Sequence, residues 1–247
     1  MLNSCSWITP NWPAPANVRA LTTTREQGVS GEPFHYYNLA LHVNDDPHKV
    51  IENRKHLKIA ANLPTEPFWL TQVHGITVVN LGEWQTPYPL IEADASVAFE
   101  PNQVCAILTA DCLPILLCNQ NGTRVSAIHA GWRGIATGVI EAAVQKLCCA
   151  PETLLAWLGP AIGPNAFEVK EDVFSLFAHS KAFVPTGKES WLANIYQLAI
   201  EKLQQLGVYH IFGGGFCTYQ DTERFYSFRR SKVTGRMASL IWLSDSP

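Results

Sequence analysis

Two histidines and one cysteine, each in a short segment that contains glycine or proline, are the residues of this sequence best suited to chemistry. His74 lies in the segment QVHG, Cys112 in ADCLP and His129 in HAGWRG. Two imidazoles and a thiolate make three ligands for zinc or a related metal and leave one coordination position open. An open position is typical of a catalytic metal site, so convergence of these side chains in the fold predicts an enzyme.

The same residues allow two kinds of chemistry. A thiolate with two imidazoles favours zinc, with copper as the alternative, and the metal would polarise a reacting oxygen or lower the pKa of a bound water. Without a metal, Cys112 as nucleophile and His129 as general base would form a cysteine-hydrolase pair. Cys112 lies 38 residues after His74 and 17 before His129, and these separations match no short motif. The sequence therefore does not decide between the metal site and the cysteine-hydrolase pair.

The segment that follows His129 predicts an anion pocket beside the metal. Gly131 and Gly134 permit a tight turn. The first N–H groups of the helix expected next lack partners and attract anions. We therefore expect Arg133, with its fixed bidentate charge, to bind phosphate or a related substrate group. Asp111, directly before Cys112, is a candidate catalytic proton donor or orienting group.

Four further polar residues are candidate substrate contacts. Asn38 and Arg54 belong to polar clusters that an apolar core would not contain, and Gln72 lies two residues before His74. Arg229 lies in FYSFRR, which combines stacking faces with guanidinium groups, as suits a base or a phosphate. A helix cap explains the first cluster equally well, and an alternating strand explains the last.

Length, charge and cysteine usage limit the class of protein. The chain has 247 residues, of which 47% are hydrophobic, and a net charge of −3. This charge argues against partners recognised through phosphate backbones, and no apolar run approaches the roughly 20 residues that span a bilayer. Seven cysteines in a chain without a signal-like start favour free thiols and a cytoplasmic location. We expect Cys105 and Cys118 to be small core residues.

The apolar periodicity predicts a mixed α+β protein that forms a single domain over residues 1–247. Strands outnumber helices, and the two types alternate only in part. The expected strands span residues 18–23, 95–99, 104–109, 115–118, 125–129, 154–158, 208–212 and 237–243, and the expected helices span residues 47–62, 134–148, 171–178 and 194–206.

Several long motifs in one order resemble a known family. TQVHG, TADCLPILL, HAGWRG, AWLGPAIGP, FYSFRR and TGRMASLIWL, from about Thr22 to Leu243, resemble the bacterial laccase-domain proteins named after multicopper polyphenol oxidases. The resemblance implies a single four-layer α/β/β/α domain with mixed sheets. It also implies zinc bound by the residues matching His74, Cys112 and His129. The implied reaction is phosphorolysis of purine nucleosides (adenosine, inosine, guanosine and methylthioadenosine), with adenosine deamination beside it.

The histidines themselves argue against oxidation by several coppers. The eight histidines contain no His-x-His pair, and the chain has only two methionines. A blue-copper oxidase with a trinuclear cluster needs many histidines, including His-x-His pairs, and a copper site with a cysteine and an axial methionine. The leading hypothesis is a zinc-dependent phosphorylase whose partners are a purine nucleoside and phosphate. It rests on the resemblance and on the open metal trio beside a helix start that could hold phosphate. A cysteine or metal hydrolase that edits a peptidoglycan precursor is the alternative. Copper-dependent polyphenol oxidation ranks third and a metal-dependent partner-binding module last, with the oligomeric state left open.

Overall fold

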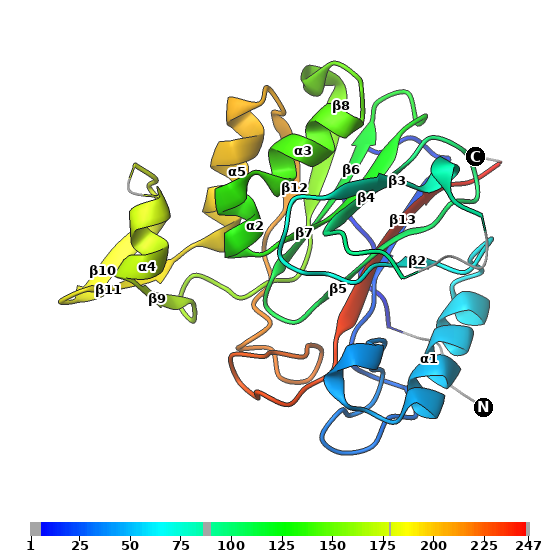
Figure 1. The fold of residues 1–247 in the computed structure, drawn as a ribbon, viewed down its shortest axis with the longest axis horizontal. Helices are drawn as coiled ribbons and strands as arrows, with labels where there is room; N and C mark the ends of the chain where they lie inside the picture. Colours follow the sequence, from blue (N-terminus) through cyan, green and yellow to red (C-terminus); the bar gives the residue numbers. More distant parts are fainter. Residues whose placement is uncertain (1–5, 86–89, 178, 246–247) are drawn as a thin grey trace.

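Two β-sheets packed face to face form the framework of this computed structural model, which describes residues 6–85, 90–177 and 179–245 (Figure 1). The six-stranded sheet contains, in spatial order, β12 (His210–Gly213), β8 (Leu154–Leu158), β6 (Leu113–Asn119), β7 (Val125–Ala130), β4 (Ala95–Ala98) and β3 (Val78–Asn80). The four-stranded sheet contains β1 (Val18–Thr22), β13 (Met237–Leu243), β5 (Cys105–Thr109) and β2 (Phe68–Trp69). Both sheets mix parallel and antiparallel pairs.

Strand β5 is apolar up to Thr109 because both faces of its sheet are covered. Successive side chains of a strand point to opposite faces of the sheet. Cys105 and Ile107 accordingly pack into the core between the two sheets. Ala106 and Leu108 pack on the other face, in a cluster with Leu57 of helix α1. Because both faces of the sheet are covered, every residue of β5 is buried.

Helices cover the outer face of each sheet. Helices α2 (Trp132–Thr137), α3 (Val139–Lys146) and α5 (Ile195–Gln205) lie on the six-stranded sheet (Figure 1). Helix α1 (Pro47–Ala60) lies on the four-stranded sheet, and it begins where the Asp46 side chain accepts a hydrogen bond from the His48 N–H. The layers are therefore α/β/β/α, which confirms the expected single mixed fold.

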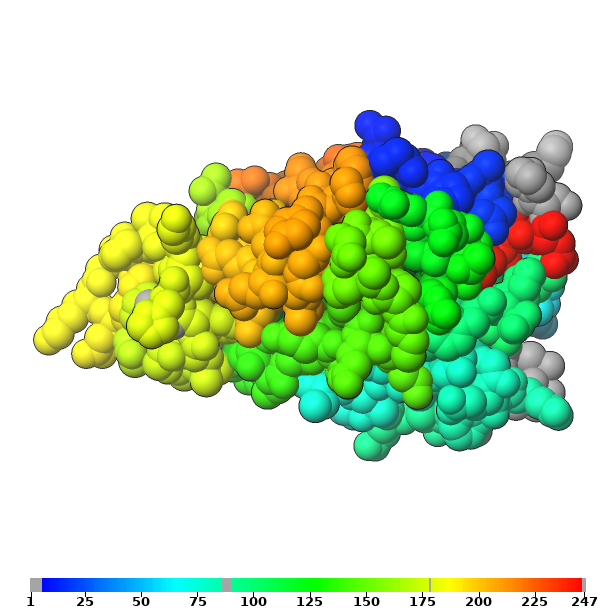
Figure 2. All heavy atoms as spheres, turned by 90° about the horizontal axis from the view of Figure 1, so that it is seen from above, coloured from blue at the N-terminus to red at the C-terminus, as the bar shows by residue number. Residues whose placement is uncertain are grey.

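A small third sheet projects from this body and was not expected from the sequence. It contains β9 (Glu168–Lys170), β11 (Ser190–Ala193) and β10 (Phe183–Gly187), and it forms the yellow end of the molecule in Figure 2. The helix expected over 171–178 is wrong in extent: it is a single turn, α4 (Glu171–Phe174), followed by a 3₁₀ turn over Ser175–Phe177. The α-helical turn ends at Phe174, whose ring stacks on Trp191 of β11 with the ring centroids 4.3 Å apart. This segment therefore packs against the small sheet. Ala178 lies outside the described residues.

Two other expectations need correction. The helix expected over 134–148 is two helices, α2 and α3, because Gly138 has a φ of +106° and breaks the hydrogen-bonded spiral. The strand that offered an alternative explanation of residues 225–230 is also wrong, since residues 225–227 have no regular secondary structure and residues 228–230 form a turn. The remaining expected strands and the helices over 47–62 and 194–206 are present, with ends that shift by one or two residues.

The cysteines of the described segments are all free. Cys105 and Cys118 are fully buried, which confirms their expected place in the core, and burial raises the pKa of both thiols to about 12. Cys5 lies outside the described residues. Within the described segments, no helix has the length and apolarity needed to cross a membrane.

The break at Gly138 generates a prediction about stability. A Cβ at Gly138 would meet nothing closer than the Glu141 carboxylate at 3.7 Å, so the cost of Gly138→Ala is backbone strain alone. We expect the free energy of unfolding to fall by about 1–2 kcal/mol in urea titrations. Gly187→Ala is the matched control because Gly187 has open space and no left-handed φ, and its effect should stay within about 0.5 kcal/mol. Equal effects of the two substitutions would contradict this account of the break.

Candidate functional site

Strand register brings Cys112 and His129 together at one end of the six-stranded sheet. Strands β6 and β7 are antiparallel, with Leu113 opposite Ala130. Cys112 therefore falls opposite Gly131, two residues after His129, which is the next-to-last residue of β7. Strand β4 pairs with the other side of β7, and the His129 N–H donates to the carbonyl of Asp94 at 2.7 Å. Both residues are therefore held by the main chain of the sheet.

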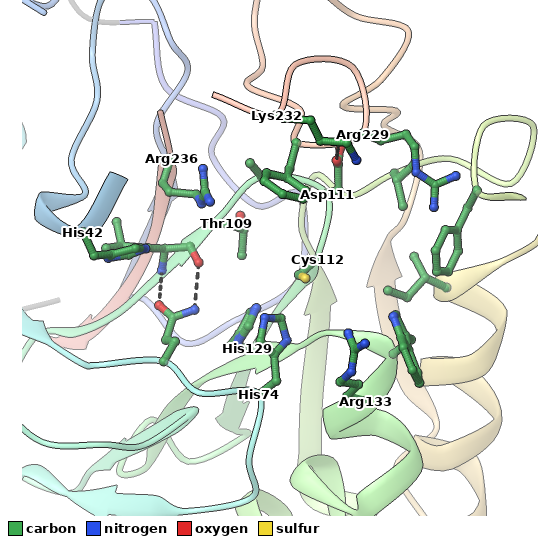
Figure 3. Close-up of a pocket in the computed structure, with 18 residues that line it drawn as sticks. His42, His74, Thr109, Asp111, Cys112, His129, Arg133, Arg229, Lys232 and Arg236 are labelled. Carbon is green, nitrogen blue, oxygen red and sulfur yellow. Dashed lines mark hydrogen bonds between the residues drawn. The ribbon is translucent and has the colours of Figure 1, made fainter. Parts of the chain in front are cut away.

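The predicted ligand trio does converge. One ligand atom each from His74, Cys112 and His129 lies within 4.8 Å of the others, and the two imidazole centroids are 4.7 Å apart (Figure 3). His129 is buried, Cys112 is half-buried and His74 is exposed, so the group is open on one side. A Cβ on Gly131 would lie 2.9 Å from Nδ1 of His74 and 3.1 Å from Sγ of Cys112, which explains the glycine at this position.

A buried carboxylate that sequence reasoning missed orients both histidines. Asp94 is fully buried, and its Oδ1 lies 2.8 Å from Nδ1 of His129. The same carboxylate accepts hydrogen bonds from the backbone N–H groups of Val73, His74 and Gly75 at 3.2, 2.9 and 2.7 Å. Since an ionised carboxylate only accepts, Nδ1 of His129 carries the proton and Nε2 remains as the ligand atom.

The ionisation of this group follows from burial and neighbouring charge. Burial alone would raise the pKa of Asp94, but the hydrogen bonds from His129 and Gly75 lower it. Burial favours neutral His129, yet the adjacent Cys112 and Asp94 outweigh burial and raise the pKa of His129 to about 9. Nε2 therefore also carries a proton near neutral pH, and a metal that binds there would displace it. Burial and the charge of His129 lower the pKa of His74, which keeps that ring neutral and able to bind a metal. Two imidazoles and a thiol in this arrangement fit an open zinc site.

The trio opens into a cavity of about 380 Å³, a size suited to a small organic molecule. Both polar side chains and aromatic rings line it, and Figure 3 labels most of the polar ones. The cavity is lined by His42, Gln72, His74, Leu108, Thr109, Ala110, Asp111, Cys112, His129, Trp132, Arg133, Ile162, Phe167, Ile195, Phe228, Arg229, Lys232 and Arg236. Four of these residues are cationic and no carboxylate other than Asp111 is among them, so the cavity favours an anionic ligand.

Gln72 and Asp111 line the cavity, but both also hold its walls in place. The Gln72 amide donates to the Leu108 carbonyl and accepts from the Leu108 N–H, both at 2.8 Å. The Asp111 carboxylate accepts from the Thr218 hydroxyl at 2.7 Å and from the Arg229 N–H at 2.6 Å. Asp111 has a φ of +88°, so a strained residue connects β5 to the segment that carries Cys112.

Arg133 and Arg229 reach the cavity from opposite walls. Arg133 lies in the first turn of α2, where its guanidinium stacks on the Trp132 ring at 4.1 Å. Because α2 has only six residues, this charged side chain contributes more to anion attraction than the helix itself. Arg229 donates to the carbonyl of Glu168 at 3.0 Å and lies over the Phe167 ring, so part of its donor capacity is already used.

Asn38 and Arg54, predicted as substrate contacts, are not brought to the cavity. Asn38 is fully buried, and its side chain bonds to Asp45 and to the main chain of residues 40 and 236. Arg54 donates to the carbonyl of Leu39 and stacks on Trp69 at 4.1 Å. These clusters therefore position the chain, and neither residue lines the cavity that the structure describes.

Sequence reasoning also missed several residues of the cavity. Thr109 and Arg236 belong to noted motifs and Lys232 lies between two of them, but no spacing rule connects these residues with Cys112. Asp94 carried a detectable signal, since it is an acidic residue directly before a strand that is buried on both faces. An ionised residue at such a position requires a partner inside the fold.

The convergence of the trio predicts a loss of metal when a ligand is removed. His74→Ala or Cys112→Ala leaves two ligands, so we expect metal content after dialysis to fall from about one ion per chain to near zero. Elemental analysis of purified protein measures this. Cys148→Ala is the matched control, because Cys148 is an exposed free thiol away from the cavity. Wild-type metal content in Cys112→Ala would show that Cys112 is not a ligand.

The contacts of Asp94 predict a separate effect. Asp94→Asn keeps the shape but removes the charge that orients His129, so we expect metal affinity to fall about 10–100-fold. Competition with a chromophoric chelator provides the measurement. Asp221→Asn, which removes a carboxylate charge paired with Arg224 outside the cavity, should leave the affinity unchanged. Unaltered affinity in Asp94→Asn would rule out the orienting role.

Comparison with known proteins shows the family. The chain is 53% identical over 246 residues to a purine nucleoside phosphorylase of Pseudomonas aeruginosa, covering 97% of this chain and 99% of that protein. It is 52% identical over 242 residues to purine nucleoside phosphorylase YfiH of Escherichia coli, covering 96% and 98%. A crystal structure of protein NMB0706 from Neisseria meningitidis matches with a TM-score of 0.92 at 43% identity, covering 96% of this chain and 99% of that chain.

A solved structure with lower sequence similarity keeps the same fold. YlmD from Geobacillus stearothermophilus matches with a TM-score of 0.90 at 26% identity, covering 99% of this chain and 98% of that chain. The family described as multi-copper polyphenol oxidoreductase laccase matches residues 19–244, which include the ligand trio and all residues that line the cavity. The chain therefore belongs to this laccase-like family, as its motifs indicated.

Proposed function

We propose that the protein is a zinc-dependent purine nucleoside phosphorylase. The observation that carries the proposal is a trio of metal ligands that opens into a cavity with four cationic side chains. Relatives with up to 53% identity are named for this reaction, and they match nearly the whole chain. The proposed substrates are adenosine, inosine, guanosine and methylthioadenosine, with inorganic phosphate as the second substrate.

The chemistry of the cavity suits this reaction. An oxygen of phosphate attacks C1′ of the ribose, the bond from C1′ to the purine nitrogen breaks, and the base leaves with a proton as ribose 1-phosphate forms. Arg133, Arg229, Lys232 and Arg236 can balance the negative charge of phosphate and of the departing base. The rings of Trp132, Phe167 and Phe228 offer faces on which a purine can stack.

The donor set favours zinc over copper. A bound zinc ion supplies Lewis-acid polarisation of an oxygen or activation of water. A blue-copper centre needs a methionine near its cysteine and histidines. Met237 does not meet this need because it is buried in another cluster and its sulfur accepts a hydrogen bond from the Tyr226 N–H at 3.1 Å. Within the described residues, His74, Cys112 and His129 are the one group found with metal-ligand spacing.

We propose an orienting role for Asp111 and a second activity for the same site. Oδ1 of Asp111 accepts a hydrogen bond from the Thr218 hydroxyl, and Oδ2 accepts one from the Arg229 N–H. Because both oxygens are engaged, we assign Asp111 to orienting the cavity wall and not to donating a proton. Activated water would extend the chemistry to adenosine deamination, in which water replaces the 6-amino group and ammonia leaves.

A cysteine hydrolase is the second candidate function, and one observation favours it. His129 bonds to Asp94 on one side and lies against Cys112 on the other, which is the order of groups in a nucleophile–base–acid triad. In that case Cys112 would attack an amide carbonyl, as in a peptidoglycan precursor. The phosphorylase remains the leading proposal because the relatives named for that reaction match nearly the whole chain.

A product assay tests the proposal. Metal-loaded protein incubated with inosine and phosphate should release hypoxanthine and ribose 1-phosphate in equal amounts. Cys112→Ala should lower the rate at least about a hundredfold, because loss of the metal removes its stabilisation of charge. Cys148→Ala should keep the full rate. An active metal-free protein that forms a covalent adduct at Cys112 would favour the hydrolase, and phenol oxidation that follows copper content would favour an oxidase.

A further inference from the structure

The strongest unexplained feature of the cavity is an unpaired hydroxyl. Thr109, the last residue of β5, lines the cavity and is 2% exposed. Its Oγ1 is buried and has no hydrogen-bond partner among the residues that the structure describes. A buried hydroxyl without a partner costs free energy, so such groups require an explanation. Donation to a ligand in the cavity provides one.

The Arg236 guanidinium lines the same cavity as this hydroxyl. Met237 pairs with Thr109 across β13 and β5, so Arg236 falls opposite Ala110, beside the end of β5. The ion pairs formed among the described residues do not include Arg236. Its hydrogen bonds to described groups leave from Nη1 toward the carbonyls of Thr234 and Gly235, at 2.8 and 3.0 Å. Nε and Nη2 therefore remain for a ligand.

The surrounding chain holds Arg236 in place before any ligand binds. The Arg236 N–H donates to Oδ1 of Asn38 at 3.0 Å, and Asn38 is fully buried. A Cβ on Gly235 would lie 2.7 Å from Cζ of Tyr226 and 2.9 Å from Cβ of Asn38, so this turn packs tightly on both residues. A donor that is already positioned loses little conformational entropy on binding.

We propose that the Thr109 hydroxyl and the Arg236 guanidinium form the phosphate subsite of the cavity. The two side chains lie on the same side of the cavity as the ends of β5 and β13, whereas Arg133 reaches it from α2 (Figure 3). A guanidinium with a neighbouring hydroxyl binds a tetrahedral oxyanion through charge-assisted hydrogen bonds. The identification of the oxyanion as inorganic phosphate rests on the function proposed above, and the phosphate group of a nucleotide is the other source of the same chemistry.

Removing the hydroxyl without changing the shape tests the subsite directly. Calorimetric titration of inorganic phosphate into metal-loaded Thr109→Val should show affinity weakened about tenfold or more, since one hydrogen bond to a charged group is lost. Thr109→Ser restores the hydroxyl and should bind within about threefold of wild type. Thr109→Val should not melt at a lower temperature, because the hydroxyl it removes has no protein partner. A purely structural role of Thr109 predicts the reverse pattern.

Arg236→Lys should also weaken phosphate binding by about tenfold, because lysine keeps the charge but loses the paired donors. Arg224→Gln is the matched control: Arg224 is an exposed arginine outside the cavity, and its loss should leave phosphate affinity unchanged. The Michaelis constant for phosphate in phosphorolysis should rise in parallel, with that for inosine changed less than about twofold.

The outcomes separate the subsite from the proposed function. Weakened phosphate binding in Thr109→Val and Arg236→Lys supports the subsite even if the wild-type protein cleaves no nucleoside. Absence of nucleoside cleavage would then reject the phosphorylase function and leave the subsite standing. Active phosphorolysis with unchanged phosphate affinity in both variants overturns the subsite and leaves the phosphorylase standing. Failure of wild type to bind inorganic phosphate overturns the subsite. Weakened binding of adenosine 5′-monophosphate with unaltered binding of inorganic phosphate overturns the assignment in favour of a nucleotide.

Discussion

The carboxylate of Asp94 is the constraint on which the candidate site depends. It is fully buried, it accepts from the His129 ring, and it accepts from three successive N–H groups around His74. One side chain therefore sets both the orientation of the ligand in β7 and the path of the turn that carries the other histidine. A buried charge with this many donors is stable only when all of them are in place, so the loop and the strand are ordered together.

The two-sheet architecture explains why metal ligands and anion-binding groups meet. Cys112 and His129 lie at one end of the six-stranded sheet, where β6 begins and β7 ends. Thr109 and Arg236 lie at the matching end of the four-stranded sheet, where β5 ends and β13 begins. Because the sheets pack face to face and β5 continues through Asp111 into Cys112, the two sets of groups open into one cavity. At strand ends, buried polar groups can face a cavity where a ligand can satisfy them.

The family name and the residues of this chain point to different chemistry. The name refers to several coppers, whereas the described residues contain one group of three side chains that could hold a single metal ion. The rest of the cavity is rich in cations and aromatic rings, a composition that suits an anionic and a planar ligand together. The relatives named as purine nucleoside phosphorylases agree with this composition.

The sequence by itself determined the ligand trio, the mixed α+β class and most strands, because these follow from side-chain chemistry and from periodicity over short distances. Tertiary structure alone decided which distant polar residues share the cavity. Asn38 and Arg54 look like site residues in the sequence, yet their polar atoms satisfy the main chain. Arg236 reaches the cavity only because β13 pairs with β5 over more than a hundred residues of intervening chain. Strand register is a property of the whole sheet, so no local pattern encodes which side chains it places together.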